Sequence, residues 1–256
     1  MENHPAYGDE KDIELFRVTE DPRACSYLPG ETASLEYRII EAATDRTCQM
    51  LVSRGWRRFG ISFFRPACEN CAECRGIRVV VEGFRPSKSQ RRCLKRNEKI
   101  KAVLQRPGIT REHIRLYNAY HADMSRRRGW PDRPIDAGDY IESLIMGAGD
   151  FGHEIRYYEG PRLVGVGLVD ILSEGVSSVY FYHDPVWRRH GPGTFSILRE
   201  IRLAKELRKP HLYLGYCIRE NPSMSYKSRF RPHEILDGSA ADDVPPSWRS
   251  PESPPA

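Results

Sequence analysis

The sequence lacks long hydrophobic runs. None of its windows approaches the roughly 18 uninterrupted apolar residues that a membrane-spanning helix needs. The first residues, MENHPAYGDEKDIE, have neither the basic start nor the apolar core of a signal peptide. These absences argue against a membrane protein and against secretion, so we expect a cytoplasmic protein with no membrane partner. The 256 residues are enough for one large domain or two small domains, each with its own core.

Paired cysteine motifs are also scarce. The chain has seven cysteines, an odd number, and one Cys-x2-Cys-x2-Cys run with no second pair elsewhere. A disulfide framework is therefore disfavoured, which leaves metal binding or free thiols. The run consists of Cys68, Cys71 and Cys74. With Cys25 as a fourth ligand it would suit tetrahedral zinc or an iron–sulfur cluster, and the alternative is a cysteine-rich turn that binds no metal.

Acidic residues are nearly absent from one stretch of the chain. The formal charge of the whole protein is only +5, but residues 85–101 contain eight cations and a single acid. We predict a helix here that begins after an N-cap at Ser87 and runs to about residue 97. Its cations at helical spacing are Lys88, Arg92, Lys95 and Lys99. A face without interspersed acids favours contact with a nucleic-acid backbone, and the alternative is a solvated surface helix.

Alternating strand and helix patterns predict an α/β chain in two parts. In the first part we expect strands at residues 35–40, 57–64 and 77–81 and a helix at 44–54. In the second part the expected order is a helix capped by Thr110, a helix at 137–146, strands at 154–159, 163–172 and 177–183, a helix at 188–207 and a strand at 212–216. We therefore predict an N-terminal cysteine-bearing domain (1–106), a second domain (107–237) and a disordered tail (238–256).

A glycine-bearing turn precedes the last long helix. It reads WRRHGPGT, residues 187–194, and follows a predicted strand. Backbone N–H groups at such a turn can bind an anion, although the glycines can equally serve only to turn the chain. The layout resembles the acyl-donor loop of GNAT-like acyltransferases, which Arg188, Gly191 and Gly193 match. His183, at the end of the preceding strand, is a candidate general base.

The segment from residue 211 to residue 232 combines aromatic and cationic side chains. We single out Tyr213, Tyr216, Tyr226, Lys227 and Arg229. Aromatic faces beside cationic groups suit a partner that carries carboxylate or phosphate together with a stackable or apolar part.

Five blocks of the sequence, taken together, resemble the arginyl-tRNA–protein transferase family, and within it the bacterial leucyltransferase branch. They occur in the family's order and are ACSYLPG, ISFFRPACENCAECRGIRV, FRPSKSQRRCLKRN, YFYHDPVWRRHGPG and LYLGYCIRENPSMSYKSRFRPHEIL. The resemblance implies a GNAT-like acyltransferase domain preceded by a smaller cysteine-bearing α/β domain. It also implies an enzyme that moves leucine from Leu-tRNA to the N-terminal amine of proteins beginning with Asp or Glu, in the N-end rule degradation pathway.

The family resemblance also implies how the chemistry proceeds. Because an aminoacyl ester is already activated and an α-amine is partly neutral near pH 7, the transfer needs no covalent enzyme intermediate and no cofactor. We expect Tyr216 and His183 to act at the reacting centre. Eukaryotic relatives place cluster-binding or zinc-binding cysteines at the positions of Cys25, Cys68 and Cys71, but Leu28 stands where a mate of Cys25 would be.

Cations should bind both substrates. We expect Lys227 and Arg229, with Arg65, to bind the acceptor's carboxylate or, as an equal alternative, the 3′ end of the tRNA. Tyr213, Tyr216 and Tyr226 are expected to contact substrate beside them. The expected tRNA contacts are Lys88, Arg92, Lys95, Lys99, Arg188, Gly191 and Gly193.

Three other functions are compatible with the sequence. The first is the same transfer with Arg-tRNA as donor, because a single sequence does not reveal which acids face the pocket. The second is a CoA-dependent GNAT acetyltransferase, favoured only by the glycine turn. The third is an RNA-binding module with a zinc knuckle and no catalytic activity.

Overall fold

The computed structural model describes residues 12–251. Its elements, in chain order, are β1 (Ile13–Thr19), β2 (Arg23–Ala24), β3 (Thr32–Ala33), β4 (Leu35–Ala42), α1 (Asp45–Ser53), β5 (Arg57–Phe59), β6 (Ser62–Pro66), β7 (Arg75–Val80), α2 (Lys88–Arg96), β8 (Ile100–Gln105), α3 (Arg111–Arg128), α4 (Ala137–Tyr140), the π-helix η1 (Ile141–Ile145), β9 (Gly152–Glu159), β10 (Arg162–Leu172), β11 (Gly175–His183), the 3-10 helix η2 (Pro185–His190), α5 (Pro192–Glu206), β12 (His211–Cys217), α6 (Pro222–Ser225), the 3-10 helix η3 (Tyr226–Arg229), β13 (His233–Leu236) and β14 (Trp248–Arg249).

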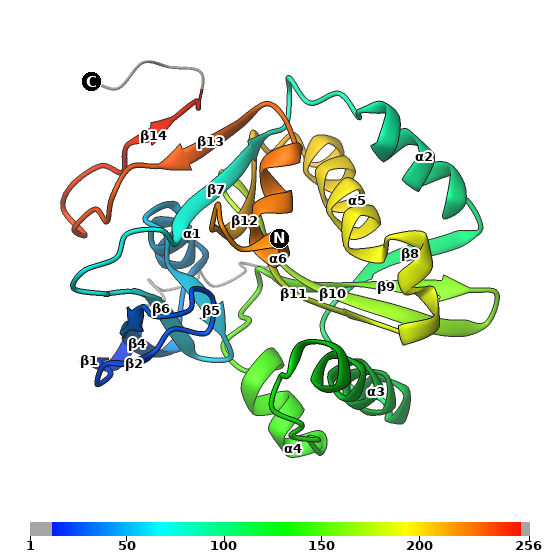
Figure 1. Cartoon of the computed structure of the whole chain (residues 1–256), viewed down its shortest axis with the longest axis horizontal. Helices are drawn as coiled ribbons and strands as arrows, with labels where there is room; N and C mark the ends of the chain where they lie inside the picture. Colours follow the sequence, from blue (N-terminus) through cyan, green and yellow to red (C-terminus); the bar gives the residue numbers. More distant parts are fainter. Residues whose placement is uncertain (1–11, 252–256) are drawn as a thin grey trace, which may run out of the picture.

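Two main sheets organise the molecule, which has a mixed α/β architecture. The larger sheet has eight strands in the order β14-β13-β7-β12-β11-β10-β9-β8, and the smaller has the order β1-β4-β6-β5. Helices α5 and α2 lie on one side of the larger sheet and α3 and α4 on the other, while the smaller sheet lies beside β7 and β12 (Figure 1). Within residues 12–251, no helix is both long enough and apolar enough to cross a membrane.

Side-chain caps begin several of the helices, among them α1, α2 and α3. Thr44 caps α1, and Thr110 caps α3, each by accepting a main-chain N–H of the first turn. Ser87 caps α2, where Gln90 completes a reciprocal capping box. Such caps satisfy N–H groups that have no partner within the helix. The predicted helix starts at Ser87 and Thr110 are therefore confirmed.

One predicted strand is instead a tight hairpin. The sequence predicts a continuous strand over residues 57–64, but β5 and β6 pair with each other in antiparallel fashion across Gly60. Gly60 has a φ of +56°, and a Cβ there would lie 2.2 Å from the carbonyl oxygen of Glu142. Only glycine combines this backbone conformation with such a close approach, so the chain reverses there.

The predicted domain boundary near residue 106 falls inside the large sheet. β7 pairs with β12 and β13, and β8 pairs with β9, although both strands precede the boundary. The main hydrophobic core also crosses it, because Ile77 and Val79 of β7 pack with Leu198 of α5 and Leu212 of β12. Residues 75–105 therefore belong to the same folding unit as the second half of the chain.

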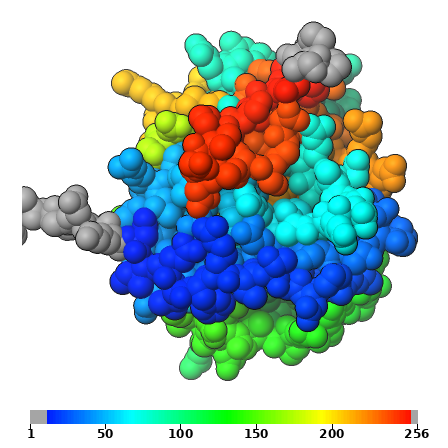
Figure 2. Space-filling view, turned by 90° about the vertical axis from the view of Figure 1, so that its left-hand side faces the viewer, coloured from blue at the N-terminus to red at the C-terminus, as the bar shows by residue number. Residues whose placement is uncertain are grey.

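The last described residues, 238–251, are packed rather than disordered, which corrects the predicted tail for this range. The guanidinium of Arg54 donates to the carbonyl oxygens of Ala241, Asp242 and Val244. Trp248 donates its indole N–H to the carbonyl of Ser53 at 3.0 Å. Figure 2 shows this red segment lying against the blue and cyan surface of the first half of the chain. Residues 252–256 of the predicted tail lie outside the described residues.

Candidate functional site

The large sheet opens between β11 and β12, which pair in parallel. Their pairing runs only from Gly175 opposite His211 to Ser177 opposite Tyr213, after which the two strands separate. Beyond Tyr213, β12 shifts its register against β7, and Gly215 takes a φ of +77°. Ligands of open α/β sheets commonly bind beyond the carboxyl ends of strands that diverge in this way. The opening is therefore a natural place for a substrate.

Tyr216 joins β12 to the first half of the chain. Its side chain is buried, and its hydroxyl donates to the carbonyl oxygen of Gly55 at 2.8 Å and lies 3.3 Å from that of Phe64. Burial raises the pKa of Tyr216, so the phenol is protonated at neutral pH. This hydroxyl is suited to positioning the two halves and is poorly suited to accepting a proton.

A cleft of about 820 Å³ lies between the smaller sheet, the cysteine loop and the C-terminal segment. It brings together five of the predicted site residues, which are Arg65, Cys68, Cys71, Cys74 and Tyr216. Within it, Arg65 forms an ion pair with Glu36 at 2.8 Å and lies 4.5 Å from the centre of the Trp56 ring. Another N–H of the same guanidinium donates to the carbonyl of Ala240. Arg65 is therefore largely occupied by groups of the protein itself.

The four predicted metal-ligating cysteines gather near one edge of this cleft. All are free and half-buried. Burial, and after it the neighbouring thiols of Cys25, Cys68 and Cys71, raise the pKa of Cys74 to about 12. In the part of the chain that the structure describes, no three His, Cys, Asp or Glu side chains are arranged to hold a metal ion. The side chains as placed therefore do not fit the predicted zinc or iron–sulfur site.

Helix η3 packs against β12 and carries three predicted substrate contacts, which are Tyr226, Lys227 and Arg229. Lys227 is half-buried, and its Nζ donates to the carbonyl oxygen of Tyr216 at 2.8 Å. Burial, and after it the charge of Arg57, lower the pKa of Lys227 to about 7. Burial, and after it the Glu200 carboxyl, raise the pKa of Tyr226 to about 12. The Lys227 amine, which lies beside the opening, therefore loses its proton more readily than an ordinary lysine does.

Tyr213 and Arg229 are predicted substrate contacts whose surroundings differ from those of Lys227. Tyr213 is buried in the core beside α1, and its hydroxyl accepts hydrogen bonds from Gln49 and Arg78. Its position indicates a packing role. Arg229 is exposed, and its carbonyl oxygen accepts from the side-chain amide of Gln90 at 3.2 Å. That bond ties the basic helix α2 to η3.

His183 ends β11 within an aromatic cluster. Its Nδ1 lies 2.8 Å from the carbonyl oxygen of Asp184, and its ring contacts Tyr120 and Trp187. Burial lowers the pKa of His183, which favours the neutral imidazole. A carbonyl oxygen can only accept, so Nδ1 carries the proton in that form and Nε2 keeps a lone pair. The geometry thus leaves Nε2 able to accept a proton.

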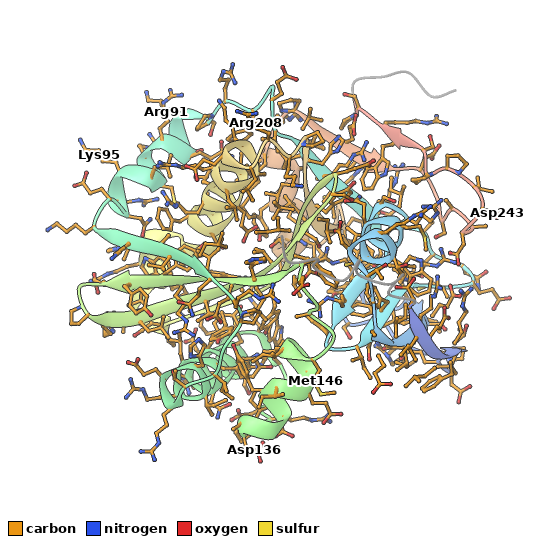
Figure 3. All side chains as sticks on the ribbon, turned by 180° about the vertical axis from the view of Figure 1, so that it is seen from behind. Arg91, Lys95, Asp136, Met146, Arg208 and Asp243 are labelled. Atoms are coloured by element: carbon orange, nitrogen blue, oxygen red, sulfur yellow. The ribbon has the colours of Figure 1, made fainter. Side chains whose placement is uncertain are left out.

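The predicted tRNA contacts on the basic helix are exposed. Lys88, Arg92 and Lys95 lie on α2, whereas Lys99 follows the helix end at Asn97. None of these four has an acid within ion-pair distance among residues 12–251. Figure 3 shows the labelled Lys95 and its neighbour on α2, Arg91, pointing away from the molecule. The face is free to meet a polyanion.

Helix α2 packs directly on the glycine turn. Asn97 donates from Nδ2 to the carbonyl oxygen of His190 at 2.9 Å and accepts the indole N–H of Trp187 at 2.7 Å. A Cβ at Gly191 would lie 3.5 Å from Sγ of Cys93 in α2, whereas a Cβ at Gly193 would meet no atom within 4 Å. The basic helix and the open start of α5 therefore form one continuous surface.

This surface extends to a group of arginines that the sequence patterns above did not single out. Asp123, near the end of α3, accepts from Arg188 at 2.7 Å and from Arg127 at 3.3 Å. Arg128 donates to the hydroxyl of Ser223 in α6, which links α3 to the segment before η3. The run Arg126-Arg127-Arg128, followed closely by an exposed tryptophan, was the available signal.

Sequence comparison identifies relatives of the chain over most of its length. The family "Arginine-tRNA-protein transferase, C terminus" matches residues 112–237, and "Arginine-tRNA-protein transferase, N terminus" matches residues 23–92. The chain is 38% identical to an aspartate/glutamate leucyltransferase of Helicobacter hepaticus over 236 residues, 92% of this chain and 98% of the relative. It is 37% identical to the enzyme of the same name from Campylobacter jejuni over 224 residues, 88% of this chain and 93% of the relative.

A likeness among solved structures is more remote. The structure described as L-PGS from Bacillus licheniformis aligns with a TM-score of 0.45 and 13% sequence identity, over 67% of this chain and 50% of that chain.

Proposed function

Because the chain belongs to the arginine-tRNA-protein transferase family, we propose that it transfers leucine from Leu-tRNA to the N-terminal amine of proteins that begin with Asp or Glu. The observation that carries this proposal is the match to curated aspartate/glutamate leucyltransferases over nearly their whole length. Such a reaction would label its products for degradation by the N-end rule pathway. We place it in the cytoplasm, where its charged tRNA is found.

The proposed reaction is aminolysis of an ester. The acceptor nitrogen attacks the ester carbonyl carbon, the bond from that carbon to the terminal ribose oxygen breaks, and an amide bond forms. The proton lost by the amine ends on the ribose oxygen that leaves. An α-amine has a pKa of about 7.7 to 8.0, so alignment of amine and ester supplies much of the rate.

The opening between β11 and β12 is the proposed reacting centre, as in a GNAT-like acyltransferase domain. Nε2 of His183 is the proposed proton acceptor, because a carbonyl oxygen fixes its tautomer. Tyr216 is the proposed positioning residue, because its hydroxyl bonds to the carbonyl oxygens of Gly55, just before β5, and of Phe64 in β6. Tyr226, beside Lys227 on η3, supplies an aromatic face for the substrate. No step is assigned to a metal ion, and metal analysis of anaerobically purified protein tests the predicted cysteine site independently.

The proposed tRNA surface runs from α2 over the glycine turn to the end of α3. Its members are Lys88, Arg92, Lys95, Lys99, Arg188, Gly191 and Gly193, with Arg126 to Arg128 added by their position in the fold. Their cations would neutralise phosphates of the acceptor arm without reading its sequence. The link from Arg128 to Ser223 leads this surface toward η3 and the opening.

A transfer assay tests the proposal. Purified protein is incubated with an Asp-starting peptide and with tRNA charged with labelled leucine or arginine, and the labelled peptide is measured. We expect transfer of leucine, and none from acetyl-CoA. Transfer of arginine alone would show that the donor is Arg-tRNA and not Leu-tRNA. Binding of tRNA with no transfer from either donor would refute the enzymatic function.

A further inference from the structure

Arg57 fills the place where β11 and β12 separate. It comes from β5 in the smaller sheet, and its two Nη atoms donate to the hydroxyl of Ser177 and to the carbonyl of Ser178. A Cβ added to Gly215 would lie 2.9 Å from Nε and 3.1 Å from Cζ of Arg57. The guanidinium therefore lies against bare backbone on one strand and is hydrogen-bonded to the other. Its position is fixed by both sides of the opening.

Arg57 has no carboxylate partner within the described residues. The neighbouring Arg58 shows the contrast, because it forms a buried ion pair with Asp170 at 2.6 Å. Guanidinium groups have five N–H donors, and the two bonds of Arg57 leave others free. Charges that are removed from water are normally paired. A half-buried guanidinium without an acid is therefore prepared for an anion from outside.

Lys227 adds a second basic group at the same place, and a bound anion would favour its protonated form. Its Nζ donates to the carbonyl of Tyr216, the residue that follows the glycine against which Arg57 lies. No acid lies within ion-pair distance of Lys227 in the part of the chain that the structure describes. Asp170 and Glu200 are both near Arg57, but neither lies within ion-pair distance of it, and Asp170 is already paired with Arg58. The pair lowers its electrostatic energy when an anion binds between its members.

We propose that Arg57 and Lys227 together bind the side-chain carboxylate of the acceptor's first residue and so select Asp and Glu. This inference rests on the proposed function. Arg57 supplies a rigid fork for a carboxylate, whereas the ammonium of Lys227 on its flexible stem adjusts to the one-methylene difference between Asp and Glu. Arg65 and Arg229, the other cations expected from the sequence, are respectively occupied by Glu36 and exposed on the surface.

The test compares three peptides that differ only in a first residue of Asp, Glu or Asn. Wild-type protein must first transfer leucine to the Asp peptide, and failure here would refute the proposed function rather than this inference. Arg57→Met and Lys227→Met are then expected to raise KM for the Asp and Glu peptides by about 10- to 100-fold. KM for Leu-tRNA should change by less than about 3-fold. The rate of the slow transfer to the Asn peptide, measured in single turnovers with enzyme in excess, should also change by less than about 3-fold.

Controls separate this role from others. Arg115→Ala removes an exposed cation of α3 and should leave all three peptides unaffected. An equal fall in kcat for every peptide at unchanged KM would overturn the inference, since it would assign Arg57 to the reacting ester. A rise in KM for Leu-tRNA in step with that for the peptides would overturn it as well. If Arg57→Met does not fold, Lys227→Met and the charge-preserving Arg57→Lys decide the question by the same measurements.

Discussion

At the residue scale, Lys227 makes a pH-dependent contribution to stability. Burial and the charge of Arg57 lower its pKa to about 7 in the folded protein, whereas a lysine in the unfolded chain titrates near 10.4. Between these values the unfolded state binds the additional proton, so stability rises with pH. Below pH 7 both states hold the proton, and the cost of the buried charge is present in full. Cys217 is the other titratable group that faces this amine.

We therefore expect wild-type protein to gain stability relative to Lys227→Met as the pH rises. Between pH 6.5 and pH 9 the difference should grow by about 1 to 2 kcal/mol, less than the full linkage value because water reaches the half-buried amine. Urea unfolding at the two pH values measures it. Lys205→Met, which removes an exposed lysine of α5, should show no such change. A pH-independent difference for Lys227→Met would mean that its amine titrates normally.

The ion pair between Arg58 and Asp170 is a second test at this scale. The side chains are 3% and 1% exposed, so either charge alone would be buried without a partner. We expect Arg58→Met or Asp170→Leu to lower the free energy of unfolding by about 3 to 5 kcal/mol. The double variant should lose less than the sum of the two, and additive losses in this double-mutant cycle would argue against direct coupling.

Residue patterns predicted part of the candidate site and missed its centre. Lys227 could be singled out because it lies in a dense aromatic and cationic segment. Arg57 could not, because it stands in an ordinary strand and its importance arises from Gly215, 158 residues further along the chain. Tyr213 resembles Tyr216 in sequence, but the shift in β12 between them leaves Tyr213 in the core beside α1. A sequence shows which side chains are available, and the tertiary contacts decide which of them meet.

At the scale of elements, α2 should contribute salt-dependent binding of tRNA. Each cation that neutralises a phosphate steepens the dependence of log affinity on log salt concentration by about 0.9 for a duplex and about 0.7 for a single strand. We expect Arg92→Ala with Lys95→Ala to weaken tRNA binding and to reduce the slope by about 1.4 to 1.8. Filter binding between 50 and 200 mM salt measures both.

The matched control for α2 removes two exposed cations from α3, on the other side of the large sheet. Arg111→Ala with Arg115→Ala carries the same change in charge and should leave the slope unchanged. If both double variants reduce the slope equally, net charge and not the face of α2 controls binding.

Elements with a local signal could be predicted, whereas those that depend on distant partners could not. The starts of α2 and α3 could be predicted from the sequence because Ser87 and Thr110 are typical N-cap residues. The short strand β14 lies in a Pro- and Ser-rich stretch that reads as disorder, yet it pairs with β13, and Trp248 packs on Tyr213. Its order comes from surface that the rest of the fold provides. Composition alone therefore underestimates how ordered such a segment is in the folded protein.

At the scale of the whole molecule, the strand pairing of the large sheet determines which fragments of the chain can fold on their own. The turn near residue 107 looks like a domain boundary because a new helix begins there, but the adjoining strands β7 and β8 complete the second half's sheet. A fragment of residues 107–256 would leave β12 without β7 and β9 without β8. It would also expose the core face that Ile77 and Val79 cover. Unpaired strands beside exposed apolar surface favour aggregation.

We therefore expect the fragment 107–256 to lack a cooperative unfolding transition. The fragment 74–256, which retains β7, α2 and β8, should unfold cooperatively, although with less stability than the full chain because Arg58 and the smaller sheet are missing. Thermal circular dichroism and the dispersion of amide signals in NMR spectra distinguish the two fragments. Cooperative unfolding of the shorter fragment would show that the second half folds without β7, and the inferred folding unit would then be wrong.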